Sequence, residues 1–208
     1  SCVHHKDVSR RLFQIFCDEV GNGEVEHNHA NIYRNLLREM GVELPACDSA
    51  EFAHWPGFLD ASFEAPALWL CVARFPRRFL AETLGLNLAI ELAGVGGAYR
   101  AGIDALRYWG YDSYFLELHN VIDNVSTGHT AWAVEAIQLY MDELRSDHGD
   151  EEVARQWTRV LAGFHSHAPA RPRGTSFWRR ALQALRPSRW NAASGPLESG
   201  SDWHGPGD

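Results

Sequence analysis

One long apolar helical segment near the middle of the chain constrains the fold most. The segment Arg77–Leu92 carries leucine or isoleucine on nearly every helical face, at Leu80, Leu84, Leu86, Leu88, Ile90 and Leu92. A helix that is apolar all round is buried on several sides. The rest of the chain must therefore supply the surfaces that cover this segment.

Helical periodicity also dominates elsewhere, whereas the signals of strands and hairpins are scarce. Apolar stripes with helical spacing predict further helices over Val8–Val20, from Asn28 or Asn31 to Met40, and over Leu68–Arg74, Tyr99–Trp109, 113–144 and 151–164. Residues 42–57, with two prolines, are expected to form a connection. We predict an all-α bundle of about six to seven helices in one domain, residues 1–167.

From residue 168 onward the composition shifts to proline, arginine, serine and glycine. We expect residues 168–208 to form a largely irregular tail, in which only 177–185 has the pattern of a short helix. The net charge of -8 argues against binding to nucleic acid, which needs a concentrated basic surface. No window reaches the apolar length of about 18 residues that a membrane span requires.

The four cysteines match no metal or redox spacing, and the first residues contain no apolar signal-peptide segment. Reduced thiols are typical of the cytoplasm, and we expect the protein to act there.

Two polar residues that share one helical face stand out in the apolar stretch 114–140. His119 and Asp123 are four residues apart, so their side chains lie one turn apart on the same face. Burying them among apolar residues is costly unless each has a partner. The pair therefore indicates either a structural His–Asp hydrogen bond or a metal site.

Two other segments favour the metal. Glu91 lies between Ile90 and Leu92 near the end of the most apolar helix, where the helix dipole disfavours a negative charge. The stretch 16–33 gathers further acids and histidines around a glycine turn: Glu19, Glu24, Glu26, His27 and His29. Carboxylates and imidazoles without thiolates favour iron or manganese over structural zinc. Inward-facing Glu and His from facing helices are how helix bundles build di-iron sites.

These segments resemble the haem-oxygenase-like di-iron oxidases, a superfamily often labelled iron-containing redox enzymes. Three stretches carry the resemblance, namely 18–41, 84–97 and 118–142, and with their spacers they cover about residues 10 to 165. The family places a Glu and a His on its first helices, a lone Glu on a middle helix, and His-x3-Asp with a further His on a late helix. His29, Glu91, His119 and Asp123 match this pattern directly.

The sequence departs from the family pattern at two positions. The first carboxylate is either Glu19 or Glu26; we favour Glu19, which directly precedes the Gly-Asn-Gly turn, and keep Glu26 as the alternative. Many relatives carry the last His three residues after the Asp, where this chain has Ser126. We assign that role to His129, which reaches the site only if the helix is kinked or broken between Asp123 and His129.

The resemblance implies an enzyme that holds two iron ions, with manganese as an alternative, and activates dioxygen as co-substrate. It would oxidise a small organic substrate, such as an amine, an amino acid or a fatty-acid-like molecule, by N-oxygenation or by C–H or C–C oxidation. An electron donor and a homodimer are further expectations. The sequence assigns no catalytic residue beyond the six metal ligands and no binding site for an organic cofactor.

Two alternatives remain at this point. One is a haem- or cofactor-binding protein of the same helical fold, although haem gains nothing from several buried carboxylates. The other is a non-catalytic helical interaction module with a structural polar core, whose arginine-rich tail would bind an acidic partner.

Overall fold

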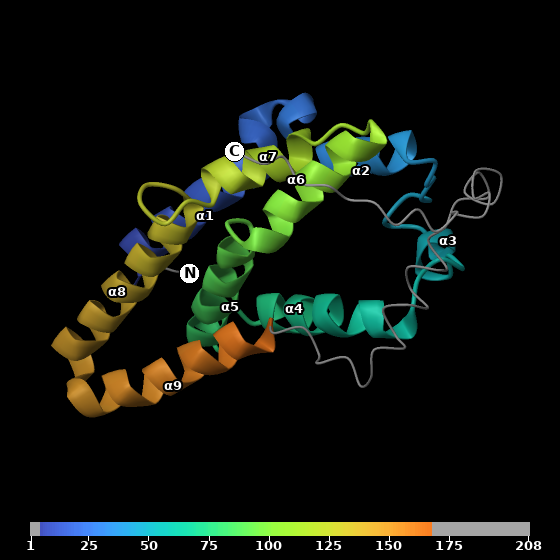
Figure 1. Cartoon of the computed structure of the whole chain (residues 1–208). Coiled ribbons are helices and arrows are strands. Elements are labelled where there is room, and N and C mark those ends of the chain that lie inside the picture. Colours follow the sequence, from blue (N-terminus) through green and yellow to red (C-terminus); the bar gives the residue numbers. More distant parts are fainter. Residues whose placement is uncertain (1–4, 168–208) are drawn as a thin grey trace, which may run out of the picture. The chain divides into compact units, whose positions relative to one another are not determined.

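The computed structural model describes residues 5–167, which contain helices and no strand. The α-helices of this range are α1 (Lys6–Glu19), α2 (His29–Glu39), α3 (Ala50–Ala53), α4 (Glu64–Arg74), α5 (Leu80–Ala93), α6 (Gly97–Trp109), α7 (Tyr114–Ile122), α8 (His129–His148) and α9 (Asp150–Ser166) (Figure 1). Short 3-10 turns lie at η1 (Gly21–Gly23), η2 (Val25–His27) and η3 (Asp60–Phe63). The predicted all-α fold is confirmed. The predicted tail, 168–208, lies outside the described residues.

The hydrophobic core gathers around α5, as the apolar pattern of this helix requires. Helix α5 packs against α8 and α9, and α8 also packs along α1. The core cluster draws on all four helices and consists of Val8, Ala81, Leu84, Ala136, Ile137, Tyr140, Met141, Leu144 and Val160. Because α8 and α9 meet at a corner at Gly149, both can contact α5 (Figure 1).

Two glycines allow α5 and α9 to approach closely. A Cβ added at Gly85 would lie 1.8 Å from the backbone oxygen of Val160, and one added at Gly163 would lie 1.9 Å from that of Glu82. The two backbones are therefore in direct contact on both sides of the crossing, and any side chain there would force the helices apart. This contact fixes the position of α5, which carries one of the predicted metal ligands.

Residues 5–167 contain more helices than predicted, for two reasons. The short helix α3 forms within the expected connection 42–57, where the Ser49 side chain accepts a hydrogen bond from the amide of Phe52 and caps it. The expected single helix over 113–144 is two helices, because α7 ends at Ile122 and α8 begins at His129. The predicted break between Asp123 and His129 is thus confirmed.

Local interactions explain the break. The side-chain oxygen of Asn124 accepts hydrogen bonds from the amides of Ser126, Thr127 and Gly128, and so closes a turn in place of a continued helix. A Cβ at Gly128 would lie 2.0 Å from the carbonyl oxygen of Ile122, so the turn needs glycine there.

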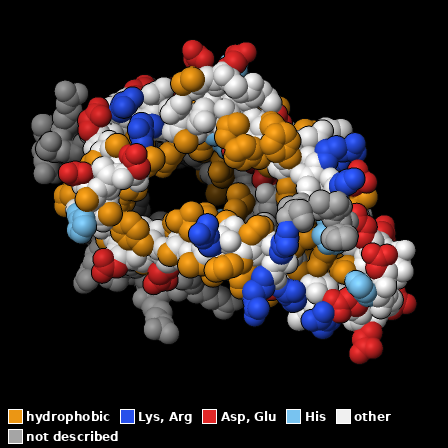
Figure 2. Space-filling model, turned by 180° about the vertical axis from the view of Figure 1, so that it is seen from behind, with side chains coloured by type: hydrophobic (Ala, Val, Ile, Leu, Met, Phe, Trp, Pro, Cys, Tyr) orange, Lys and Arg blue, Asp and Glu red, His pale blue; other side chains and the backbone are white. Residues whose placement is uncertain are grey.

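Apolar sequence does not by itself lead to burial. Helix α4 contains Leu68, Trp69, Leu70 and Val72, yet none of its residues is buried. Hydrophobic side chains are also exposed on the face in Figure 2, where several border a hollow in the surface. None of the helices within 5–167 combines the length and the apolar character needed to span a membrane.

Candidate metal centre

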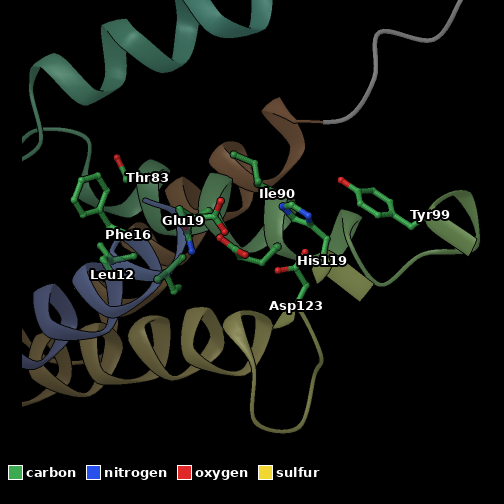
Figure 3. A pocket seen from close by; sticks show the side chains of 11 residues that line it. Leu12, Phe16, Glu19, Thr83, Ile90, Tyr99, His119 and Asp123 are labelled. Atoms are coloured by element: carbon green, nitrogen blue, oxygen red, sulfur yellow. The ribbon is translucent and has the colours of Figure 1, made fainter. Parts of the chain in front are cut away.

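All six predicted metal ligands lie at or near helix ends, and these ends converge beside α5. Figure 3 shows three of them, Glu19, His119 and Asp123, close together. Glu19 ends α1, His29 begins α2, Glu91 lies in the last turn of α5, His119 and Asp123 lie at the end of α7, and His129 begins α8. The break between α7 and α8 is what turns both Asp123 and His129 into this cluster.

One group of potential ligands consists of Glu19, His29 and His119, whose donor atoms lie within 4.8 Å of one another. The Nδ1 atom of His29 lies 2.7 Å from Oε2 of Glu19, and the rings of His29 and His119 are 4.7 Å apart between centroids. The Nδ1 atom of His119 lies 2.6 Å from the carbonyl oxygen of Phe115. Because a carbonyl only accepts, this Nδ1 carries the proton and Nε2 keeps a free lone pair.

A second group consists of Glu19, Glu91 and His129. The Nδ1 atom of His129 lies 3.3 Å from Oε2 of Glu91, 3.4 Å from Oε1 of Glu19 and 3.4 Å from Oδ1 of Asp123. Glu19 therefore belongs to both groups, with Oε2 toward His29 and Oε1 toward His129. A carboxylate shared in this way could bridge two ions.

Several donor atoms in the cluster are buried without a hydrogen-bond partner among the described residues: Nδ1 of His29, Nδ1 of His129 and Oδ1 of Asp123. Buried polar atoms are normally hydrogen-bonded. These atoms are close to one another but not aligned for hydrogen bonds, which is the arrangement of groups that face a shared cation. No hydrogen bond between His119 and Asp123 occurs in the described chain, so the pair does not form the simple structural contact considered above.

The charges of the cluster also call for a cation. Burial alone would lower the pKa of His129, but the surrounding carboxylates of Asp123, Glu19, Glu91 and Asp18 outweigh it and raise the pKa to about 12. Burial would raise the pKa of Glu19, whereas the close approach of the His129 and His29 rings holds it at about 2. Burial and the charge of Asp123 raise the pKa of Glu91 despite its contact with His129.

The structure also distinguishes Glu19 from Glu26, the alternative for the first carboxylate ligand. Glu26 lies on the 3-10 turn η2, is exposed and joins neither group of potential ligands. Glu19 is placed by the end of α1 directly opposite His29. The described geometry therefore favours Glu19.

Sequence reasoning missed Asp18. Its Oδ2 accepts a hydrogen bond from Nε2 of His129 at 3.1 Å, and its Oδ1 accepts one from the side-chain amide of Asn22 at 2.8 Å. A carboxylate on the outer ring nitrogen fixes the tautomer of a ligating histidine and leaves the inner nitrogen, here Nδ1, for a metal. The only sequence signal is that Asp18 directly precedes Glu19.

Gly94 is a second residue that the sequence did not reveal as part of the site. A Cβ at Gly94 would lie 1.7 Å from Oδ2 of Asp123, so only glycine leaves room for this carboxylate in its present position. Gly94 follows α5 directly, three residues after Glu91. The end of α5 thus provides one carboxylate and accommodates another.

Comparison with known proteins identifies the family of the chain. A model of the family described as "iron-containing redox enzyme" matches residues 2–164, a range that includes all six predicted ligands. A search of curated proteins and a search of solved structures find no match. The family match covers most of the chain, and its iron fits the carboxylate and imidazole donors described above. The chain therefore belongs to the iron-containing redox enzyme family.

Proposed function

We propose that this protein is a non-haem di-iron oxidase or oxygenase that uses dioxygen to oxidise a small organic substrate. The observation that carries the proposal is the position of Glu19, whose two carboxylate oxygens face two separate groups of buried donors. Two-metal sites hold their ions about 3.5–4 Å apart, a spacing that a bridging carboxylate suits. The six ligands would be Glu19, His29, Glu91, His119, Asp123 and His129.

The surrounding residues prepare the donors for metal binding. Phe115 holds the proton of His119 on Nδ1 through its carbonyl, and Asp18 holds that of His129 on Nε2. Each ring would therefore present its other nitrogen to an ion without rotating, and the ion would replace the second proton of His129. No cysteine joins either group within the described residues, which favours iron or manganese over structural zinc.

Ferrous ions at this site would supply the electrons that activate dioxygen. The chain itself provides a hydrogen-bond donor nearby: Tyr99 lines the adjoining cavity, and its ring centroid lies 6.0 Å from that of His119. Burial and the charges of Asp123 and Glu19 raise the pKa of Tyr99 above its usual value, so its hydroxyl holds its proton firmly. The Tyr99 hydroxyl could therefore donate a hydrogen bond to a group bound in the cavity.

The test is to load the full chain with ferrous iron under anaerobic conditions and to measure bound iron per chain. We expect two ions in the wild type and fewer than one in His119→Ala. The matched control is His148→Ala, which removes an exposed histidine at the far end of α8. Dioxygen uptake by the loaded wild type, with a reductant present, then tests for oxidase chemistry.

Two results would contradict the proposal. A Soret band after addition of haem, with no binding of free iron, would favour the haem-binding alternative. If wild type and His119→Ala both bind no metal and the variant only loses stability, the cluster is structural and the interaction-module alternative is favoured.

A further inference from the structure

The cavity beside the candidate metal centre extends beyond the predicted ligands. It has a volume of about 400 Å³ and is lined by Leu12, Ile15, Phe16, Glu19, Thr83, Asn87, Ile90, Glu91, Tyr99, His119 and Asp123. In Figure 3, Tyr99 and His119 lie toward one end, Thr83, Phe16 and Leu12 toward the other, and Glu19 between them. The metal centre therefore occupies only part of the space.

One face of α5 carries a polar stripe along this cavity. Thr83, Asn87 and Glu91 are spaced by four residues, so their side chains follow one another on the same face of an otherwise apolar helix. With a rise of about 1.5 Å per residue, Asn87 lies about 6 Å from Glu91 along the helix axis. The stripe thus runs from the metal centre into the part of the cavity that holds no predicted ligand.

Asn87 has an unused hydrogen-bond donor. Its side-chain nitrogen Nδ2 is buried and has no hydrogen-bond partner among the described residues. Thr83, one turn away, donates its hydroxyl hydrogen to the carbonyl oxygen of Phe79 at 2.8 Å and does not accept a hydrogen bond from Asn87. Buried amides are normally paired, so this donor indicates a ligand with an acceptor atom at this position.

In the metal-free chain, the charges of the lining oppose an anionic partner for this donor. The ionisable residues of the cavity are acidic (Glu19, Glu91 and Asp123) or are His119 and Tyr99, and no lysine or arginine lines it. A buried carboxylate without a cation is strongly disfavoured. Apolar side chains from α1 and α5 form the remaining wall: Leu12, Ile15, Phe16 and Ile90.

We propose that Asn87 is a substrate-binding residue whose Nδ2 donates a hydrogen bond to the neutral carbonyl oxygen of an otherwise apolar ketone or amide. The body of this molecule packs against the apolar wall, and the atom to be oxidised lies about 6 Å from the carbonyl oxygen, next to Glu91. The identity of the oxidised atom rests on the proposed function, whereas binding at Asn87 does not require a metal.

The test measures dissociation constants of three probes of similar chain length, methyl hexyl ketone, octanoate and octylamine, by ligand-detected NMR on the full chain. We expect wild type to bind the ketone about tenfold more tightly than octanoate, because only the ketone leaves no buried charge unpaired. Asn87→Leu should weaken ketone binding about tenfold. Gln138→Leu, which removes an exposed amide from α8 beside a different cavity, should change it less than twofold.

A second variant separates a binding role from a structural role. Asn87→Asp replaces the donor with an acceptor of nearly the same shape, so it should weaken binding of the ketone and strengthen binding of octylamine relative to wild type. Thermal melting of each variant checks that it is folded. A variant that only lost stability would not bind the ketone more weakly and octylamine more tightly at the same time.

Three outcomes would overturn the proposal: ketone binding within twofold of wild type in both Asn87 variants, tighter binding of octanoate than of the ketone, or no binding of any probe. Iron content is measured in the same samples. Iron loading without Asn87-dependent binding contradicts this proposal alone, and Asn87-dependent binding without iron loading contradicts only the proposed di-iron function.

Discussion

The hydrophobic core and the candidate metal centre share three helices and both contain fully buried side chains, yet they differ in what holds them together. Leu84 in the core and His129 in the centre are each 1% exposed. Helices α1, α5 and α8 contribute to both regions. The core consists almost entirely of apolar side chains, whereas the centre packs three carboxylates, Glu19, Glu91 and Asp123, around ring nitrogens.

This difference separates the source of stability from the source of function. Burial of apolar surface stabilises the core without any ligand. Burial of several carboxylates around one protonated histidine costs free energy unless a cation replaces the proton. Removing an apolar side chain from the core should therefore lower the stability of the protein. Removing a carboxylate from the centre should instead weaken metal binding and raise the stability of the metal-free protein.

The largest effect should come from the core. Leu84→Ala removes a fully buried side chain of α5 and should lower the free energy of unfolding by about 2–5 kcal/mol. Leu70→Ala is the matched control on α4, because Leu70 is 73% exposed, and should change it by less than about 0.5 kcal/mol. Denaturant unfolding measures both. Equal effects would mean that α4 is as deeply packed as α5 in solution.

Glu91→Gln should act in the opposite sense. This change removes a metal ligand, so ferrous iron should bind about 100-fold more weakly. It also removes a buried charge whose pKa burial raises, so the metal-free protein should become more stable. Calorimetric titration and thermal melting with a chelator test the two parts, with the exposed Glu51→Gln on α3 as control. If metal-free Glu91→Gln is less stable than metal-free wild type, the buried charge of Glu91 does not destabilise the protein as inferred.

Asp18→Asn should weaken metal binding about tenfold without removing a ligand. The neutral amide accepts the Nε2 hydrogen bond of His129 less strongly and stabilises the protonated ring less, so the pKa of His129 should fall below its wild-type value. NMR titration of the histidine ring nitrogens in metal-free protein measures this pKa directly. Asp7→Asn, an exposed change on the same helix, is the control. An unchanged pKa of His129 in Asp18→Asn would show that Asp18 does not act on this ring.

The smallest effect, counted per pH unit, should be the change in the free energy of unfolding of the metal-free protein with pH. His129 has a pKa near 6.5 when unfolded and about 12 when folded, so its contribution is complete below pH 6.5 and is lost as pH rises. Glu19, with a pKa of 4.5 lowered to about 2, stabilises above pH 4.5 and loses this effect as pH falls toward 2. The free energy of unfolding should therefore decline above pH 6.5, by at most about 1.4 kcal/mol per pH unit for one proton.

Urea unfolding with a chelator between about pH 5.5 and 8.5 measures this decline. Leu84→Ala should lower the whole curve without changing its slope, because Leu84 carries no proton. Saturating ferrous iron should abolish the decline, because the ion replaces the proton on His129. A flat curve for the metal-free wild type would mean that His129 is neutral in the centre.

Much of this protein could be predicted from local sequence. Helical periodicity placed the helices, because a stripe of apolar residues every three or four positions needs only local geometry to form. The helix predicted to end at Met40 ends at Glu39 with Met40 as its C-cap, and Asn28 caps its start as one of the two expected residues. The break before His129 was predicted because a continuous helix would keep His129 away from the other ligands.

Only the tertiary structure decided which residues meet. Helical periodicity defines a face but not its partner, so two apolar helices, α4 and α5, differ in burial: α4 has no buried residue, whereas α5 has six. The choice of Glu19 over Glu26, the contact of Asp18 with His129 and the unpaired amide of Asn87 all depend on the relative positions of separate helices. The sequence by itself thus determined the helices and the kinds of ligand, while long-range packing decided how they form a site.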